Sequence, residues 1–125
     1  MPRILLDEDV PAGFRHLVPG HDVRTVPDMG WAGMANGQLL AAAEADGFDI
    51  FITGDRNIAH QQAIVGRRLA IIVLSEIHWP TIRQHPNPIC QAVERAGEGA
   101  YIEVVLPRPP QRRRPAPNRG GNQPD

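Results

Sequence analysis

Short apolar runs alternate with polar and turn-forming segments along the first 106 residues. The pattern predicts strands near residues 4–6, 22–26, 50–52, 69–74 and 101–106. The runs at 50–52 and 69–74 are apolar throughout, which is typical of strands buried on both faces of a parallel sheet. The last run alternates polar and apolar residues, so we expect it at an edge of that sheet.

Helices are predicted between these strands. Pro11 suits the first turn of a helix that ends near Pro19-Gly20, and Asn36 is predicted to cap a helix that ends before Gly47. Two further helices are expected over residues 57–65 and from Pro86 or Pro88 to about residue 96. The resulting βαβαβαβαβ order predicts a three-layer α/β fold, with a mainly parallel five-stranded sheet and helices on both faces.

Two stretches are expected to be irregular. Residues 27–34 combine glycine and proline with large apolar side chains, so we expect this loop to fold back on the core. The stretch that opens at Trp79-Pro80 is predicted to be a looser region. The domain is therefore expected to span residues 1–106.

The end of the chain differs in composition from the rest. Residues 107–125 contain six Pro and five Arg with a single acid, a net charge of +4, whereas residues 1–106 carry eight Arg and thirteen acids, a net charge of −5. Such a segment buries too little apolar surface to offset its ordering entropy. It is predicted to be a disordered Pro/Arg-rich tail.

Cysteine usage and hydropathy bear on the compartment. Cys90 is the only cysteine and cannot form an internal disulfide, and no apolar run approaches the roughly 20 residues of a membrane span. The sequence also lacks the apolar segment of a signal peptide. These features favour a cytoplasmic protein without a membrane partner.

Acidic side chains follow two of the predicted strands. Asp7 comes directly after residues 4–6, and Asp55 follows residues 50–52. Ligand sites in open parallel sheets lie outside the carboxyl ends of the strands, and two carboxylates there suit Mg²⁺ or Mn²⁺. Acids at helix starts also stabilise the first turn, and the pattern alone leaves both interpretations open. Glu8 and Asp9 are interpreted as helix-start acids.

Several motifs resemble a small bacterial group of PIN-like domains, relatives of toxin–antitoxin ribonucleases. The resemblance covers about residues 3–106. It rests on the segments Leu-Leu-Asp-Glu-Asp-Val-Pro at 5–11, Gly-Trp-Ala-Gly at 30–33, Asn-Gly-Gln-Leu-Leu at 36–40, Phe-Asp-Ile-Phe-Ile-Thr-Gly-Asp-Arg-Asn at 48–57 and Gly-Arg-Arg at 66–68. The resemblance implies a doubly wound parallel sheet, a Mg²⁺ or Mn²⁺ site, and cleavage of RNA.

The resemblance assigns catalytic and metal-binding roles to three positions. Asp7 matches the first acid of the PIN-like pattern, and Asp55 matches the acid of its Thr-x-Asp motif. Asn36 stands where the pattern has an acid, so it would offer a neutral oxygen in place of a carboxylate. The four-carboxylate site of these nucleases is thereby reduced to two acids in this chain.

Arginines supply candidate substrate contacts. Arg56 is expected to contact the scissile phosphate, and Arg67 and Arg68 are candidates for holding the RNA backbone. The alternative for the latter pair is a solvated turn. Arginines of the tail, Arg112–Arg114, are expected either to add salt-sensitive affinity for nucleic acid or to keep the chain soluble.

The leading interpretation is a metal-dependent endoribonuclease that acts as the toxin of a toxin–antitoxin pair. Its partners would be RNA and a cognate antitoxin protein. The alternative is a PIN-fold protein that binds RNA or a partner protein without cutting. The oligomeric state stays open, with a homodimer among the alternatives.

Overall fold

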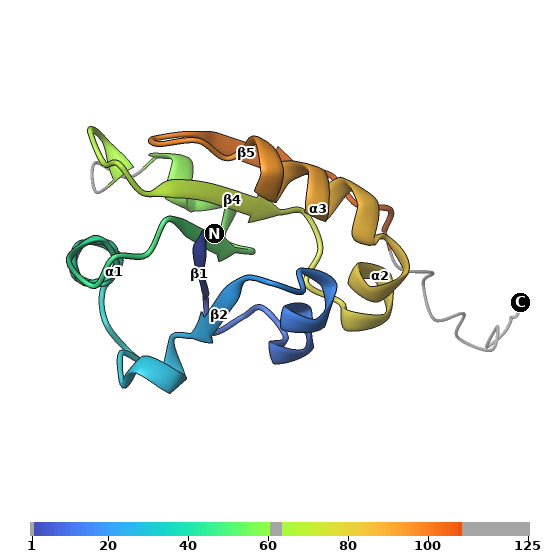
Figure 1. The fold of residues 1–125 in the computed structure, drawn as a ribbon, viewed down its shortest axis with the longest axis horizontal. Coiled ribbons are helices and arrows are strands. Elements are labelled where there is room, and N and C mark those ends of the chain that lie inside the picture. The colour runs from blue at the N-terminus through green and yellow to red at the C-terminus, as the bar shows by residue number, and fades with distance from the viewer. Residues whose placement is uncertain (1, 61–63, 109–125) are drawn as a thin grey trace, which may run out of the picture.

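A computed structural model describes residues 2–60 and 64–108 of the chain (Figure 1). Five strands form one sheet in the order β2-β1-β3-β4-β5, and every neighbouring pair is parallel. The strands are β1 (Arg3–Leu6), β2 (Asp22–Thr25), β3 (Ile50–Thr53), β4 (Ala70–Leu74) and β5 (Tyr101–Val104). The predicted α/β fold with a parallel five-stranded sheet is therefore confirmed, and the sheet is parallel throughout.

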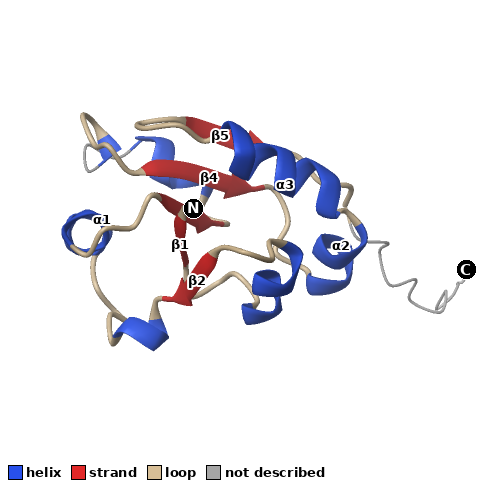
Figure 2. Ribbon diagram, viewed as in Figure 1, coloured by secondary structure: helices blue, strands red, loops and turns tan. Residues whose placement is uncertain are grey.

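Helices fill most of the connections between the strands (Figure 2). In that view α1 lies to the left of β1, and α2 and α3 lie to its right. The α-helices are α1 (Asn36–Ala45), α2 (Trp79–Gln84) and α3 (Pro86–Arg95), and the 3₁₀ helices are η1 (Ala12–Leu17), η2 (Pro27–Met29) and η3 (Arg56–His60).

Burial along the strands follows their place in the sheet. Every residue of β3 and β4 is buried, whereas the edge strands β2 and β5 each have a single buried residue, at the carboxyl end. Leu5, Ile52 and Ile72 are at most 1% exposed, as their place in the central strands predicts. The continuous apolar runs at 50–52 and 69–74 thus mark the middle of the sheet.

Side chains of the strands alternate between two hydrophobic clusters, because successive residues point to opposite faces. Ile4, Leu6, Ile50 and Ile52 belong to one cluster, which also contains buried residues of η1, α2 and α3. The other cluster contains Leu5 and the remaining alternate strand residues, with buried residues of α1 and η3. This arrangement is consistent with the three-layer fold that the sequence predicts.

One of the predicted local structures is wrong, and another is confirmed as a shorter type of helix. The looser region expected after Trp79 is α2, which begins with Pro80 in its first turn, where a proline costs no hydrogen bond. The helix expected after Pro11 is present as the 3₁₀ helix η1, which ends at Leu17 as predicted. These two elements pack together, since a Cβ added to Gly13 of η1 would lie 2.9 Å from the Trp79 ring.

The loop at residues 27–34 folds back on the core, as predicted for two of its large side chains. Met29 and Trp31 pack against the cluster that contains α1, and the Trp31 ring meets the Phe48 ring edge-on at 6.1 Å between centroids. Met34 is 37% exposed and does not join them. An edge-on aromatic pair adds specific geometry to the apolar burial.

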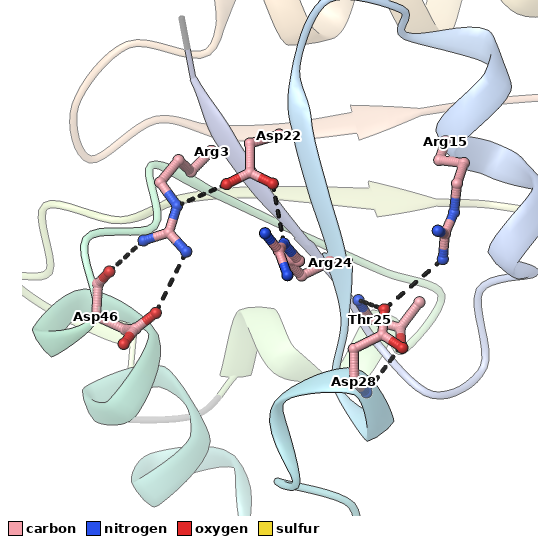
Figure 3. A network of polar contacts seen from close by, with 7 residues as sticks. All are labelled: Arg3, Arg15, Asp22, Arg24, Thr25, Asp28 and Asp46. Carbon is pink, nitrogen blue, oxygen red and sulfur yellow. Dashed lines mark hydrogen bonds and ion pairs between the residues drawn. The ribbon is translucent and has the colours of Figure 1, made fainter.

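Ion pairs tie together the amino end of the sheet (Figure 3). Arg3 of β1 binds Asp22 of β2 at 3.1 Å and Asp46, after α1, at 3.3 Å, and it also donates to the Asp46 carbonyl oxygen. Arg24 binds the second oxygen of Asp22 at 3.0 Å. The Arg3 guanidinium also lies 4.3 Å from the centroid of the Phe48 ring. Arg3 thus joins two strands and α1.

Some predictions fall outside the described residues. The helix expected over residues 57–65 is described as η3 up to His60, but residues 61–63 lie outside the described part. The same is true of residues 109–125, so the predicted disordered tail stays a prediction. Within residues 2–60 and 64–108, no helix is long and apolar enough to cross a membrane.

Candidate active site

Asp7 and Asp55 lie at the same end of the sheet, where the strands have their carboxyl ends. Each follows the carboxyl end of its strand, β1 or β3, and these strands are hydrogen-bonded neighbours. The Asp7 N–H donates to the Ile52 carbonyl at 2.9 Å, which extends the pairing of β1 with β3 by one residue. The chain crosses from β1 to β2 on one side and returns to β3 on the other, so these acids stand where the strand order reverses. Open α/β sheets bind ligands at this position.

Thr53 joins the two acid-bearing segments. Its hydroxyl, on a fully buried residue, donates to Asp7 Oδ2 at 2.6 Å and accepts the Asp55 N–H at 3.0 Å. A hydrogen bond from a hydroxyl to a carboxylate at this distance is charge-assisted and strong. Thr53 therefore orients the Asp7 carboxylate and holds it beside the backbone of Asp55.

Each of the two carboxylates also accepts a hydrogen bond from a backbone N–H group close to it in the sequence. Asp7 Oδ1 accepts the N–H of Glu8 at 2.8 Å, and Asp55 Oδ1 accepts the N–H of Asn57 at 2.9 Å. Asp55 thus caps the start of η3, and its carboxylate acts in the helix-start role that the sequence left open. The cap uses one carboxylate oxygen and keeps the side chain in a defined orientation.

Asp9 is a third acid at the carboxyl end of the sheet, and the sequence analysis did not identify it as a candidate site residue. The prediction that Glu8 and Asp9 are helix-start acids is wrong, because η1 begins at Ala12 and has no acid in its first turn. Asp9 Oδ1 instead accepts the Gly54 N–H at 3.3 Å, and Glu8 Oε2 accepts the Gly33 N–H at 2.9 Å. The run of three consecutive acids was the only sequence signal for this role.

Gly54 allows Asp9 to reach the loop after β3. A Cβ at this position would overlap the Ile77 side chain and lie 2.9 Å from Asp9 Oδ2. Real Cβ atoms do not approach neighbours so closely, so any larger residue would displace Asp9 or Ile77. The glycine of the Thr-Gly-Asp sequence at 53–55 is therefore a steric requirement for Asp9 and Ile77 to approach this loop.

Electrostatics at this edge disfavour a third negative charge. Burial raises the pKa of the Asp9 carboxyl, and the neighbouring Asp7 and Asp55 carboxylates raise it further, against the lowering effect of the hydrogen bond from Gly54. Among the described residues, no Arg or His side chain forms an ion pair with any of the three acids. Within the described residues, no ion pair offsets their mutual repulsion.

The donor set suits a hard cation, although no complete cage is formed. Among the residues that the structure describes, no group of three or more His, Cys, Asp or Glu side chains is arranged to hold a metal ion. Mg²⁺ needs no such cage, because it keeps several waters and binds through one or two carboxylates. Asp7 and Asp55, with oxygen donors of fixed orientation, fit that requirement.

Asn36 is placed differently from its prediction. It is the first residue of α1 rather than its cap, since Ala35 holds the cap position and forms no side-chain hydrogen bond there. The predicted capping role of Asn36 is therefore wrong. Because α1 connects the carboxyl end of β2 to the amino end of β3, its first residue belongs to the same end of the sheet as the acids.

The three candidate arginines separate into two groups. Arg56 follows Asp55 and its guanidinium donates to the Ser75 carbonyl oxygen at 3.3 Å, just past the end of β4. Arg67 and Arg68 precede β4 and therefore stand at the opposite end of the sheet. Arg56 therefore lies at the same end of the sheet as Asp7 and Asp55, and the other two arginines lie at the opposite end.

The Glu44 side chain of α1 binds the segment that contains Arg67 and Arg68. Its Oε1 binds the Arg67 guanidinium at 2.9 Å, and its Oε2 accepts the backbone N–H groups of Arg68 at 2.6 Å and Leu69 at 3.0 Å. Arg67 therefore has a structural role in holding this loop against α1. A cavity of about 430 Å³ beside Arg68 lies at this amino end and is remote from the three acids.

Comparisons with known proteins identify no family for this chain. No family model matches it, and neither the curated proteins nor the solved structures searched include a significant match.

Proposed function

We propose that this chain is a metal-dependent nuclease that cleaves RNA. The observation that carries the proposal is the Thr53 hydroxyl, which links the Asp7 carboxylate to the backbone of Asp55 at the point where the strand order reverses. Two oriented carboxylates without a basic partner among the described residues suit a divalent cation and a phosphodiester substrate.

Asp7 and Asp55 are the residues that would hold Mg²⁺ or Mn²⁺. When bound, such a cation supplies a water of lowered pKa and balances negative charge on the phosphate. Thr53 keeps the Asp7 carboxylate oriented through its 2.6 Å hydrogen bond. Asp9 is a third acid close enough to interact electrostatically with both Asp7 and Asp55, and its negative charge would favour a cation at this end of the sheet.

Arg56 is the candidate phosphate contact. Its side chain is exposed, and the one carbonyl hydrogen bond that the structure gives it, to Ser75, leaves most of its five N–H donors for a ligand. A guanidinium binds phosphate through two parallel hydrogen bonds, so a substrate phosphate beside Asp55 is within its chemistry. Arg67 has a structural role at the other end of the sheet and is left out of this substrate site.

RNA as the substrate and the toxin role rest on the resemblance of residues 3–106 to PIN-like domains that are relatives of toxin–antitoxin ribonucleases. A toxin would act on RNA in the cytoplasm and be neutralised by a cognate antitoxin protein. These parts of the proposal are separable from the chemistry of the acids, because a nuclease with the same site can serve another pathway.

Binding of RNA or a partner protein without cleavage is the second candidate. Asn36 stands where PIN-like nucleases have an acid, and the described acids do not form a three-ligand group. A site with fewer negative charges holds a divalent cation less tightly. This alternative predicts RNA binding that is indifferent to loss of the acids.

The test is cleavage of structured RNA by the full chain in Mn²⁺ and in EDTA. Asp7→Asn and Asp55→Asn keep the side-chain shape and remove the charge, so each should lower the cleavage rate at least about 100-fold, which corresponds to about 2.7 kcal/mol. Glu94→Gln, at an exposed position of α3, is the matched control and should cleave like the wild type. Melting temperatures establish that each variant is folded.

Three results would count against the nuclease proposal. Cleavage that persists in EDTA excludes the metal, and cleavage that survives both Asp→Asn substitutions excludes these acids. RNA binding without cleavage, unchanged in the two variants, would favour the second candidate.

A further inference from the structure

One face of the edge strand β5 is exposed in the part of the chain that the structure describes. Tyr101 is 37% exposed and Val105, just past the strand, is 80% exposed, and Glu103 between them is exposed as well. The alternate residues Val104 and Leu106 are buried in the core cluster. The side chains at 101, 103 and 105 therefore form a strip on one side of the strand, which we name the β5 strip.

A cavity lies between the β5 strip and Arg56, the residue that follows Asp55. Its volume is about 250 Å³, and its lining residues are Arg56, Val73, Ser75, Glu103, Val104 and Val105. Arg56 is next to Asp55 in the chain, so the cavity begins one residue from a carboxylate of the proposed active site. Its size is just below the roughly 300–1,000 Å³ of clefts that hold drug-sized ligands, so it suits one nucleotide base.

The cavity is lined by two opposite charges that do not neutralise each other. Glu103 and Arg56 form no ion pair within 4.0 Å among the described residues. In the described part of the chain, each side chain has one long hydrogen bond: the Tyr101 hydroxyl donates to Glu103 Oε2 at 3.4 Å, and Arg56 donates to the Ser75 carbonyl at 3.3 Å. A carboxylate and a guanidinium are thus both accessible to a ligand.

The Tyr101 hydroxyl is the hydrogen-bond partner that the structure gives the Glu103 carboxylate. Burial raises the pKa of the Tyr101 hydroxyl, and the nearby negative charge of Glu103 raises it further. The hydroxyl therefore stays protonated at neutral pH and donates to Glu103. Since each carboxylate oxygen has two lone pairs, this contact leaves both oxygens able to accept from a ligand.

We propose that this cavity binds one base of the nucleic-acid substrate, that Glu103 selects guanine, and that Arg56 binds the attached phosphate. The inference rests on the nuclease function proposed above and names the base that lies beside the cleaved bond. The substrate is single-stranded at this base, because the Watson–Crick edge has to be free to meet Glu103.

The choice of guanine follows from donor geometry. A carboxylate accepts hydrogen bonds and offers no donor, so it pairs best with a base that presents two N–H groups side by side. The Watson–Crick edge of guanine does this with its ring N–H and its amino group. Adenine, cytosine and uracil each place an acceptor beside their donor, and that acceptor would meet a carboxylate oxygen.

The remaining lining suits the flat surface of a base. Val73 pairs with Glu103 in the sheet register and so lies on the same face, and with the exposed Val105 it gives the lining its apolar part. Apolar contact on the ring and hydrogen bonds at its edge are the two parts of recognition of an unpaired base. Glu103 thus determines which base binds, and Arg56 contributes equally to the binding of all nucleotides.

The experiment measures binding of the four ribonucleoside monophosphates to the full chain in EDTA, by NMR titration. GMP should bind about tenfold or more tightly than AMP, CMP or UMP, the size expected for one bidentate base contact. Glu103→Gln should remove this preference and leave the binding of the other three unchanged. Arg56→Ala should weaken all four nucleotides by a similar factor.

Tyr101→Phe separates a positioning role from a structural one. It keeps the ring and removes the hydroxyl, so the preference for GMP should fall while the melting temperature stays close to that of the wild type. Equal binding of all four nucleotides by the wild type would overturn the inference, as would a GMP preference that survives Glu103→Gln. Absence of any nucleotide binding would overturn it too.

Because binding is measured in EDTA, the two proposals fail separately. GMP preference without RNA cleavage in Mn²⁺ would leave the base site standing and remove the nuclease. Cleavage without a preference for guanine next to the cut bond would leave the nuclease standing and remove the base site.

Discussion

Acidic residues form ion pairs at one end of the parallel sheet, and those at the other end form none with a described residue. At the amino end, Asp22 and Asp46 bind Arg3, and Glu44 binds Arg67 (Figure 3 shows the Arg3 group). At the carboxyl end, the group Asp7, Asp9 and Asp55 forms no ion pair with a described residue. One end uses acids to join strands, and the other gathers acids that repel one another.

The pKa directions express the same contrast. Burial alone would raise the pKa of Glu44, but hydrogen bonds from Leu69, Arg67 and Arg68 lower it below its ordinary value. Burial and neighbouring carboxylates raise the pKa of Asp9. An acid with a lowered pKa stabilises the folded chain, whereas an acid with a raised pKa costs stability. We expect such a destabilising cluster of acids at a site where a bound ligand offsets the repulsion between the carboxylates.

The largest effect is expected when the link between the two acids is cut. Thr53→Val keeps the shape of a fully buried side chain and removes the hydroxyl that joins Asp7 to the Asp55 backbone. Leaving both groups without this partner should lower the free energy of unfolding by about 1–3 kcal/mol. Chemical denaturation measures that loss, and calorimetry should show weaker Mn²⁺ binding.

Thr53→Ser is the control for this prediction. It retains the hydroxyl and loses one methyl group, so Mn²⁺ binding should be retained even where stability falls. Equal Mn²⁺ affinity in Thr53→Val and the wild type would show that orientation of Asp7 is unimportant for the cation.

A smaller effect is expected at the amino end. Glu44→Gln removes the charge that accepts from Arg67, Arg68 and Leu69, so it should lower the free energy of unfolding by about 1–2 kcal/mol at pH 7. Because the folded pKa of Glu44 is lowered, its contribution is fully present above the ordinary pKa of 4.5 and is lost as pH falls through the folded value.

The difference between Glu44→Gln and the wild type should therefore shrink in acid. Unfolding experiments at pH 7 and at about pH 3 measure it, with Glu94→Gln as the exposed control on α3. A difference that does not change with pH would mean that the Glu44 charge contributes nothing and that only its shape matters.

The smallest effect, and the only one of opposite sign, is expected at the carboxyl end. Asp9→Asn keeps an oxygen to accept from Gly54 and removes repulsion with Asp7 and Asp55. It should raise the free energy of unfolding at pH 7 by less than about 1 kcal/mol, since exposed charges are screened. Thermal unfolding in metal-free buffer measures this gain, which should diminish in high salt.

Added Mn²⁺ should reverse the order of the two proteins. A cation stabilises the form that binds it better, so the wild type should gain more than Asp9→Asn. A loss of stability on Asp9→Asn in metal-free buffer would show that the acids of this edge do not repel one another. The contrast between the two ends of the sheet would then disappear.

Several features of the fold could be predicted from the sequence because they depend on local pattern. Continuous apolar runs marked β3 and β4 as central, and the alternating run at 101–106 marked β5 as an edge strand. Once the sheet is taken as parallel, acids that follow two strands must share one edge. The amino-acid sequence alone therefore predicts that Asp7 and Asp55 lie at the same edge.

What only the tertiary structure decided concerns contacts between segments far apart in the chain. Asp9 reaches Gly54, 45 residues away, and Arg67 binds Glu44, 23 residues away, and no local pattern distinguishes these from other charged residues. Strand order put β1 beside β3 and so placed Thr53 between the acids. Hydrophobic periodicity determines which face of a segment is buried, but the partners of a polar side chain depend on how the segments pack.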